Sequence, residues 1–87
     1  MASYSIRWKK SSVKELRKVN KTSIPRIIEA VEELALNPYP AGVKKLVGSE
    51  HTFRIRVGNY RIVYEIEKSD IIIEIIRVRH RKDIYRK

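Results

Sequence analysis

Three arginines lie close together in the stretch FRIRVGNYRIVYEI, residues 53–66. Apolar and polar residues alternate on both sides of a central Gly-Asn pair, which is typical of a β-hairpin with a two-residue loop. That loop would place Arg56 directly opposite Arg61, with Arg54 diagonal to both on the same face. Like charges in such positions destabilise a hairpin, whereas guanidinium groups bind phosphate oxygens in a bidentate manner. We therefore predict a phosphodiester-binding face, with a solvated strand surface as the alternative.

A second group of candidate residues lies in HRKDIY, residues 80–85. His80 is a possible general acid or base near neutral pH, and Arg81 could reach the same phosphate as the hairpin arginines. Tyr85 could stack on a base or transfer a proton through its hydroxyl group. Each residue has an ordinary alternative: a surface histidine, a solvated charge, and an aromatic ring that packs the tail onto the sheet.

Other common kinds of site find little support in the sequence. The chain has no cysteine, only the two histidines His51 and His80, and no carboxylates at metal-ligand spacing. We therefore expect no metal and no small-molecule cofactor. Three glycines cannot build a Gly-rich phosphate loop, and no nucleophile elbow of a serine triad is present.

The charge of the chain predicts a polyanionic partner. The 87 residues include 20 Lys and Arg against 10 Asp and Glu, which gives a net charge of +10 and a pI near 10.2. Such an excess points to nucleic acid, an anionic membrane or an acidic protein. The opening MASYSIRWKK does not form a signal peptide, DIIIEIIRV is too short to span a bilayer, and cysteine is absent. We therefore expect a cytoplasmic protein with no membrane partner.

The elements that would position these residues begin with a short strand at 4–8 and two helices. Ser12 and Glu15 have the spacing of a capping box, which predicts the start of the first helix. Ser23 is the predicted N-cap of the second helix, with a proline in its first turn. The second helix has an apolar face of helical period, and it is predicted to end at Asn37 because a proline follows.

Three or four strands are predicted after the helices: a short strand or extended segment at 43–48, the hairpin at 53–66, and a last strand at 71–80 after a turn at 69–70. The last strand is apolar on both faces, which predicts a central position in the sheet. The sequence thus predicts one α+β domain, residues 1–87, with a small antiparallel β-sheet and two N-terminal helices packed on one face, in the order β-α-α-β-β-β. The residues expected to meet the helices are Phe53, Ile55, Val57, Ile62, Tyr64 and Ile66.

Two segments, KKLVGSEHTFRIRVGNYRIVYEI and IIIEIIRVRHRKDIY, resemble the RelE/ParE superfamily of toxins, and RelE in particular. The specific features are Lys45-Leu46 with Gly48, the arginine hairpin, and His80-Arg81 followed by Tyr85. The resemblance covers nearly the whole chain. It implies the β-α-α-β-β-β fold and a toxin that a cognate antitoxin protein neutralises. It also implies a metal-independent endoribonuclease that cuts messenger RNA in the ribosomal A site, by attack of the ribose 2′-OH on its own 3′ phosphate.

The resemblance also implies roles for individual residues. Arg54 and Arg56 match positions beside the scissile phosphate, and Arg61 matches the arginine that stabilises the transition state. Arg81 matches the arginine that assists the leaving group, and Tyr85 matches the tyrosine that stacks on the substrate base. Further basic residues would dock the protein onto 16S ribosomal RNA: Lys9, Lys10, Lys44, Lys45, Arg79 and Lys82.

One departure from the family concerns the general base. Some members have lysine where this chain has Arg54 and Arg56, and a lysine can lose its proton. Arginine cannot, because its pKa lies above about 12. The base would then be His80, Tyr85 or a group of the ribosomal RNA.

Two alternatives to the nuclease remain open. ParE-like members of the superfamily have a similar fold and inhibit DNA gyrase without cutting RNA. The other alternative is a nucleic-acid-binding module without catalysis, or a toxin that has lost its activity. The three-arginine hairpin and the ending with His80, Arg81 and Tyr85 favour the nuclease. In either toxin reading, an acidic or amphipathic antitoxin segment is expected to cover the arginines or to pack in the apolar groove around the helices.

Overall fold

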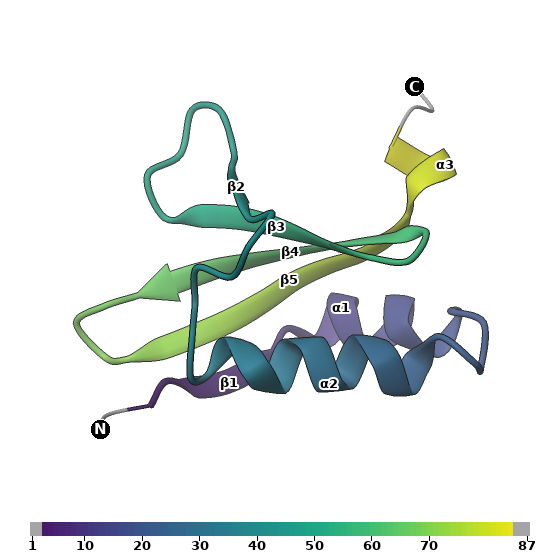
Figure 1. Cartoon of the computed structure of the whole chain (residues 1–87), viewed down its shortest axis with the longest axis horizontal. Helices are drawn as coiled ribbons and strands as arrows, with labels where there is room; N and C mark the ends of the chain where they lie inside the picture. Colours follow the sequence, from purple (N-terminus) through teal and green to yellow (C-terminus); the bar gives the residue numbers. More distant parts are fainter. Residues whose placement is uncertain (1–2, 85–87) are drawn as a thin grey trace.

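The computed structural model describes residues 3–84, so Tyr85 lies outside the described residues. The elements are β1 (Ser5–Trp8), α1 (Lys10–Arg17), α2 (Ile24–Leu34), β2 (Lys44–Lys45), β3 (Thr52–Val57), β4 (Tyr60–Glu67), β5 (Ile72–His80) and α3 (Arg81–Ile84). The strands form one sheet in the order β1-β5-β4-β3-β2. Helices α1 and α2 cover one face of it, and α3 rises from the other side (Figure 1). The predicted α+β class and the position of the two helices are confirmed. No helix in the described part of the chain is long and apolar enough to cross a bilayer.

The sheet is mixed and not wholly antiparallel as predicted. Strands β2, β3, β4 and β5 pair antiparallel in succession, but β1 pairs parallel with β5, from Ser5 opposite Ile72 to Trp8 opposite Ile75. Two helices and three strands separate β1 from β5 in the chain, so no hairpin turn fixes their relative direction. The interior position predicted for β5, by contrast, is confirmed from Ile72 to Ile75, where β1 lies on one side and β4 on the other.

The N-termini of the two main helices differ in part from the predictions. Helix α1 begins at Lys10 with Lys9 at the N-cap position, and no side chain caps it. The Ser12 hydroxyl donates a hydrogen bond of 2.6 Å to the Lys9 carbonyl, so the predicted capping box is wrong. Ser23 does occupy the N-cap position of α2, with Pro25 in the first turn, but its side chain makes no cap hydrogen bond.

Glu15, the other half of the predicted capping box, attaches α1 to the edge of β5 instead. Its Oε1 accepts a hydrogen bond of 2.8 Å from the Val78 amide, and its Oε2 accepts one of 2.9 Å from Arg79 Nε. Strand β1 stops pairing with β5 at Trp8, so this part of the β5 edge has no strand beside it. The carboxylate satisfies an edge amide and places a charge where another strand could otherwise add.

The core lies between α2 and the covered face of the sheet. Its buried members are Val19, Ile27, Val31, Leu34, Ile55, Ile62, Tyr64, Ile66, Ile73, Ile75 and Val78. Each fully buried side chain of this size contributes about 1.5–3 kcal/mol. The predicted inner face of the hairpin is confirmed, with Phe53 and Val57 packed at its margin. Burial raises the pKa of the Tyr64 hydroxyl above its usual value, and this hydroxyl donates a hydrogen bond of 2.8 Å to the Pro38 carbonyl.

A β-bulge interrupts the pairing of β4 with β5. Val63 lies opposite Arg77, but its neighbour Tyr64 lies opposite Ile75, so Ile76 has no partner of its own on β4. A bulge adds one residue to one strand and thereby changes which side chains point to each face.

The bulge determines which residues of β5 are exposed. Ile73 and Ile75 are fully buried before it, and Val78 is buried after it. If Ile76 paired regularly, strict alternation would carry Arg77 and Arg79 onto the core side with Ile75. Because Ile76 is bulged instead, both arginines lie on the outer face. This strand is apolar at both odd and even positions, a pattern that the sequence analysis interpreted as burial on both faces. The bulge explains part of the pattern, because the buried positions change from odd to even there.

Candidate phosphate-binding site

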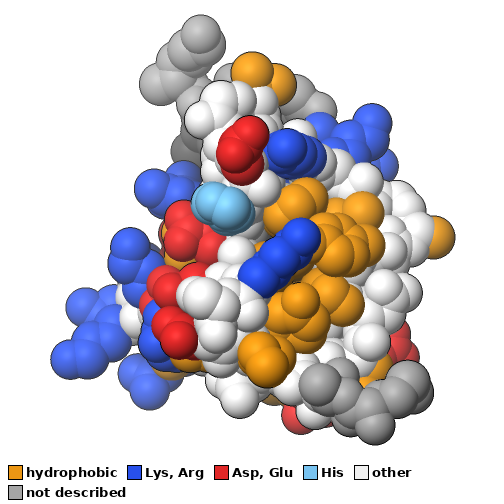
Figure 2. Space-filling model, turned by 90° about the vertical axis from the view of Figure 1, so that its left-hand side faces the viewer, with side chains coloured by type: hydrophobic (Ala, Val, Ile, Leu, Met, Phe, Trp, Pro, Cys, Tyr) orange, Lys and Arg blue, Asp and Glu red, His pale blue; other side chains and the backbone are white. Residues whose placement is uncertain are grey.

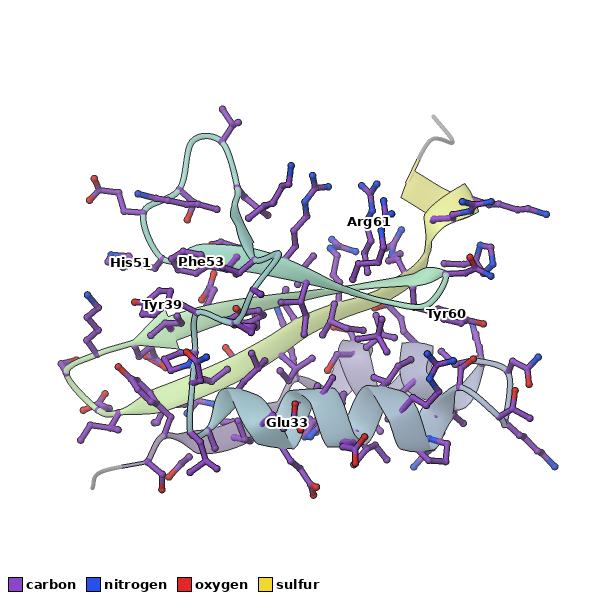
Figure 3. All side chains as sticks on the ribbon, in the orientation of Figure 1. Glu33, Tyr39, His51, Phe53, Tyr60 and Arg61 are labelled. Carbon is purple, nitrogen blue, oxygen red and sulfur yellow. The ribbon has the colours of Figure 1, made fainter. Side chains whose placement is uncertain are left out.

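The outer face of the sheet, away from α1 and α2, carries a row of three arginines on adjacent strands. Arg56 of β3 lies directly opposite Arg61 of β4, and Arg61 lies directly opposite Arg79 of β5. The pairing of Arg56 with Arg61 is the one predicted from the two-residue loop. In Figure 3, Arg61 points away from the helices, whereas its neighbour Tyr60 lies on the helix side.

A second row runs parallel to the first. Lys44 of β2 lies opposite Arg54 of β3, Arg54 lies opposite Val63 of β4, and Val63 lies opposite Arg77 of β5. The six cations of the two rows are called the arginine face below: Lys44, Arg54, Arg56, Arg61, Arg77 and Arg79.

Little negative charge balances the arginine face. Arg79 pairs with Glu15 at 2.9 Å. Among the described side chains, Arg54, Arg56 and Arg77 form no ion pair. Like charges directly opposite each other on neighbouring strands are destabilising, so this arrangement is not explained by the stability of the sheet.

Two adjoining hollows lie within the arginine face. One, of about 360 Å³, is lined by Gly42, Lys44, Arg54, Ile55, Arg56 and Arg61. The other, of about 190 Å³, is lined by Leu46, Arg54, Arg61, Val63, Arg77 and Arg79. Arg54 and Arg61 line both hollows and therefore lie at the centre of the site. Guanidinium groups spaced in this way can bind consecutive phosphates of one nucleic-acid strand.

His80 does not join the arginines. It follows Val78 by two residues and lies opposite Tyr60, whose ring packs against the core, so it lies on the helix side of the sheet. The His80 and Tyr60 rings meet edge to face at 5.2 Å. The His80 Nδ1 atom accepts a hydrogen bond of 3.1 Å from the Lys82 amide, which places the proton of the neutral ring on Nε2.

Helix α3 carries the next predicted residues. Arg81 and Lys82 are both exposed, and the Arg81 amide donates a hydrogen bond of 2.8 Å to the Asn59 carbonyl in the hairpin loop. This bond ties the start of α3 to the tip of the hairpin. The prediction for Tyr85 lies outside the described residues.

The predicted docking residues divide between the two sides of the sheet. Lys44 and Arg79 belong to the arginine face. Lys45 lies opposite Phe53, which packs against the core, so it points to the other side. Lys9 and Lys10 lie at the start of α1 in the helix layer, and both are exposed.

Sequence reasoning missed Arg77. The available signal was its spacing of two from Arg79 in the segment RVR, which places both on one face of a strand. The bulge beside Arg77 hides which face that is, because it changes the alternation between Ile75 and Arg77.

An apolar hollow of about 300 Å³ lies in the helix layer, lined by Ile6, Trp8, Val13, Leu16, Ile28 and Glu32. It joins β1, α1 and α2, the region where the sequence predicts a groove for an amphipathic segment. A second apolar surface lies at the end of the molecule that carries Tyr39 and Phe53, whose rings pack edge to face at 5.4 Å. Figure 2 shows hydrophobic side chains gathered at this end.

Comparisons with known proteins agree with the fold. A family model described as "ParE toxin of type II toxin-antitoxin system, parDE" matches residues 6–85. Toxin RelE3 of Methanocaldococcus jannaschii is 41% identical over an alignment of 80 positions, which covers 87% of this chain and 89% of that protein. Toxin RelG of Mycobacterium tuberculosis is 37% identical over an alignment of 89 positions, which covers 97% of this chain and 98% of that protein. A chain of the archaeal RelE-RelB complex from Pyrococcus horikoshii OT3 superposes with a TM-score of 0.80 at 30% identity, covering 91% of this chain and 96% of that one.

Proposed function

The chain belongs to the RelE/ParE family of toxins of type II toxin-antitoxin systems, and from this premise we propose that it is a ribosome-dependent endoribonuclease that cuts messenger RNA. In the proposed reaction the ribose 2′-OH attacks the adjacent 3′ phosphate, and the 5′ oxygen of the next nucleotide leaves. The phosphorus passes through a pentacoordinate state that carries additional negative charge. Preorganised positive charge lowers the energy of that state.

The observation that carries the proposal is the arginine face. Its central residues, Arg54 and Arg61, line both hollows. We assign Arg61 to the phosphate in the transition state, with Arg54 and Arg56 on either side of it. Arg81 would assist the leaving group from α3, and Tyr85 would stack on a base of the substrate.

The general base requires a separate assignment. The arginines cannot supply it, and His80 lies across the sheet from them. Of the described residues that line the larger hollow, Lys44 is the one that is neither an arginine nor uncharged, and lysine serves as a general base in other enzymes. We therefore add Lys44 to Tyr85 and the ribosomal RNA as a candidate base.

A cognate antitoxin is the proposed protein partner. The structural relative from Pyrococcus horikoshii is part of a RelE-RelB complex. In this chain, the apolar hollow lined by Trp8, Leu16 and Ile28 could receive the apolar side of an antitoxin helix. Acidic residues of the same antitoxin could neutralise the arginine face.

Inhibition of DNA gyrase is the second candidate function. The matching family model is described by the name ParE, which favours this reading, whereas the relatives at 41% and 37% identity are named RelE3 and RelG. In this case the arginine face would be a docking surface and not a catalytic one.

A cell-free translation reaction distinguishes the two functions. The 5′ ends of a messenger are mapped after addition of the protein, with and without ribosomes. Cuts at codon positions that require ribosomes would support the nuclease. An Arg26→Gln variant, which removes an exposed charge from α2, serves as the net-charge control for substitutions in the arginine face. Absence of cuts together with inhibited supercoiling by gyrase would replace the nuclease by the second candidate.

A further inference from the structure

Helix α3 is a single turn that begins without a loop where β5 ends. His80 is the last residue of the strand, and Arg81 is the first of the four residues of the helix. A single turn gains too little from its own hydrogen bonds to offset the cost of its nucleation. The position of α3 therefore depends on the partners that its amides find outside the helix.

Two such partners hold the first two amides of α3. The Arg81 amide donates a hydrogen bond of 2.8 Å to the Asn59 carbonyl. The Lys82 amide donates one of 3.1 Å to His80 Nδ1. Because His80 directly precedes the helix, the second bond has the pattern of an N-cap, from the second helical amide back to the capping side chain. The usual N-cap residues are serine, threonine, aspartate and asparagine, so a histidine at this position gives no cap signal in the sequence.

The His80 ring is itself held in place from the helix side of the sheet. Tyr60 lies opposite it on β4, and the two rings pack edge to face at 5.2 Å. The Tyr60 hydroxyl in turn accepts a hydrogen bond of 3.3 Å from the Asn20 amide, in the connection between α1 and α2. Contacts thus run from the helix layer through the half-buried His80 ring to the backbone of α3.

Proton transfer to a substrate does not explain this arrangement. A general base must come within hydrogen-bond distance of the proton that it accepts. His80 and Tyr60 lie on the helix side of the sheet, whereas Arg61 points to the other side (Figure 3). The nitrogen of the neutral His80 ring that can accept a hydrogen bond is already occupied by the Lys82 amide.

We propose that His80 is a positioning residue, whose Nδ1 caps α3 and thereby fixes the position of Arg81 for the proposed cleavage reaction. Helix α3 rises from the outer side of the sheet, and Arg81 is the first residue of the capped turn (Figure 1). A small rotation of α3 would therefore displace the Arg81 guanidinium, and a displacement of about 1 Å can lower a rate by about 100-fold. The proposal rests on the proposed function for the role of Arg81, but not for the cap itself.

Two substitutions of His80 separate the possible roles of its side chain. His80→Asn keeps an oxygen that can cap the helix, but it has no ring and cannot carry a proton. His80→Phe keeps a ring beside Tyr60, but it has no acceptor. His80→Phe should lower the rate of cleavage at saturating ribosome concentration by about tenfold, the effect expected from loss of one N-cap bond. Its half-saturating concentration should stay within about twofold of the parent, and His80→Asn should recover the rate to within about threefold.

Solvent exchange of backbone amides, measured by NMR, tests the cap without a ribosome. The Lys82 amide should exchange about tenfold faster in His80→Phe than in the parent chain, and at close to the parental rate in His80→Asn. The amides of β4 should exchange at parental rates in both variants, which verifies that the sheet is folded. If the parent chain cuts no messenger RNA, the proposed function fails, and the exchange rates still decide whether His80 caps α3.

Three outcomes of these experiments would overturn the proposal. Loss of cleavage in both variants would assign His80 to proton transfer. Loss in His80→Asn alone would mean that the ring acts by packing against Tyr60. Parental cleavage in both variants, or a Lys82 amide whose exchange is unchanged in His80→Phe, would show that α3 keeps its position without the cap.

Discussion

The two ends of the outer face of the sheet differ in how their charges are balanced. At one end, Arg7 of β1 donates to Glu67 at 2.9 Å and to Glu74 at 3.3 Å. We call these three residues the paired end. At the other end of the same strands, β4 and β5, the arginine face gathers six cations, with Glu15 as a partner of Arg79. Strand type and exposure to solvent are similar at the two ends. Under the proposed function the difference reflects use: the paired end stabilises the sheet, and the arginine face binds RNA.

The largest expected effect is on the rate of messenger cleavage, which should fall for a substitution in the arginine face and not for one at the paired end. Arg61→Gln should lower ribosome-dependent cleavage by about 10²- to 10³-fold, as removal of one donor to a developing oxyanion does in other enzymes. Arg7→Gln should leave cleavage within a few-fold of the parent chain. Rates are measured by primer extension on a defined messenger, with circular dichroism to verify folding. Equal losses in the two variants would remove the functional distinction between the two ends.

A smaller effect concerns Glu15, a carboxylate that reaches the arginine face from the helix layer. Glu15→Ala leaves the Val78 amide without its acceptor and Arg79 without its partner. The free energy of unfolding should fall by about 1–3 kcal/mol, the cost of an unsatisfied buried group. Glu15→Gln, which keeps an amide oxygen, should lose less. Urea denaturation measures both, and a Glu15→Ala variant as stable as the parent would show that this edge does not need the carboxylate.

The paired end should contribute less to stability than its geometry suggests. The Arg7 and Glu67 side chains are 51% and 40% exposed, and water screens such pairs. Arg7→Gln should therefore lower the free energy of unfolding by at most about 1 kcal/mol, and added salt should shrink the difference. The same urea titrations give this value at two salt concentrations. A loss that persists at high salt would mean that Arg7 acts through packing and not through charge.

The smallest effect has the opposite sign. Arg56→Thr removes one of two arginines that lie directly opposite each other, and threonine suits an exposed strand. The variant should be more stable than the parent by a few tenths of a kcal/mol, because cross-strand repulsion is relieved. Thermal melts at low salt should show a small rise in melting temperature that salt reduces. A lower melting temperature would indicate that Arg56 supports the sheet, and the contrast with the paired end would weaken.

Local patterns in the sequence were sufficient to predict the hairpin and its register. A two-residue Gly-Asn loop leaves one register, so the facing of Arg56 and Arg61 followed directly and is confirmed. The helical period of 24–34 likewise fixed the buried face of α2, where Ile27, Val31 and Leu34 are buried. Both predictions rest on interactions between residues near each other in the chain.

Contacts between distant segments were not predictable in the same way. Ser12 and Glu15 have the spacing of a capping box, but the Glu15 carboxylate accepts a hydrogen bond from the amide of Val78, which lies 63 residues away in the chain. The direction of β1 depends on packing beside β5, which no local pattern records. The face occupied by His80 depends on the bulge. Regular alternation from Ile75 would place His80 on the outer face, together with the hairpin arginines.

The bulge at Ile76 makes the pairing of β5 as important as its composition. If Ile76 took part in regular pairing, four side chains would exchange environments, with Arg77 and Arg79 turned inward and Val78 and His80 turned outward. Deletion of Ile76 should therefore be tolerated, because regular alternation from Ile75 to Arg77 then keeps these side chains on their present faces. A redesign of the site should change side chains while keeping the residue count from Arg77 to His80.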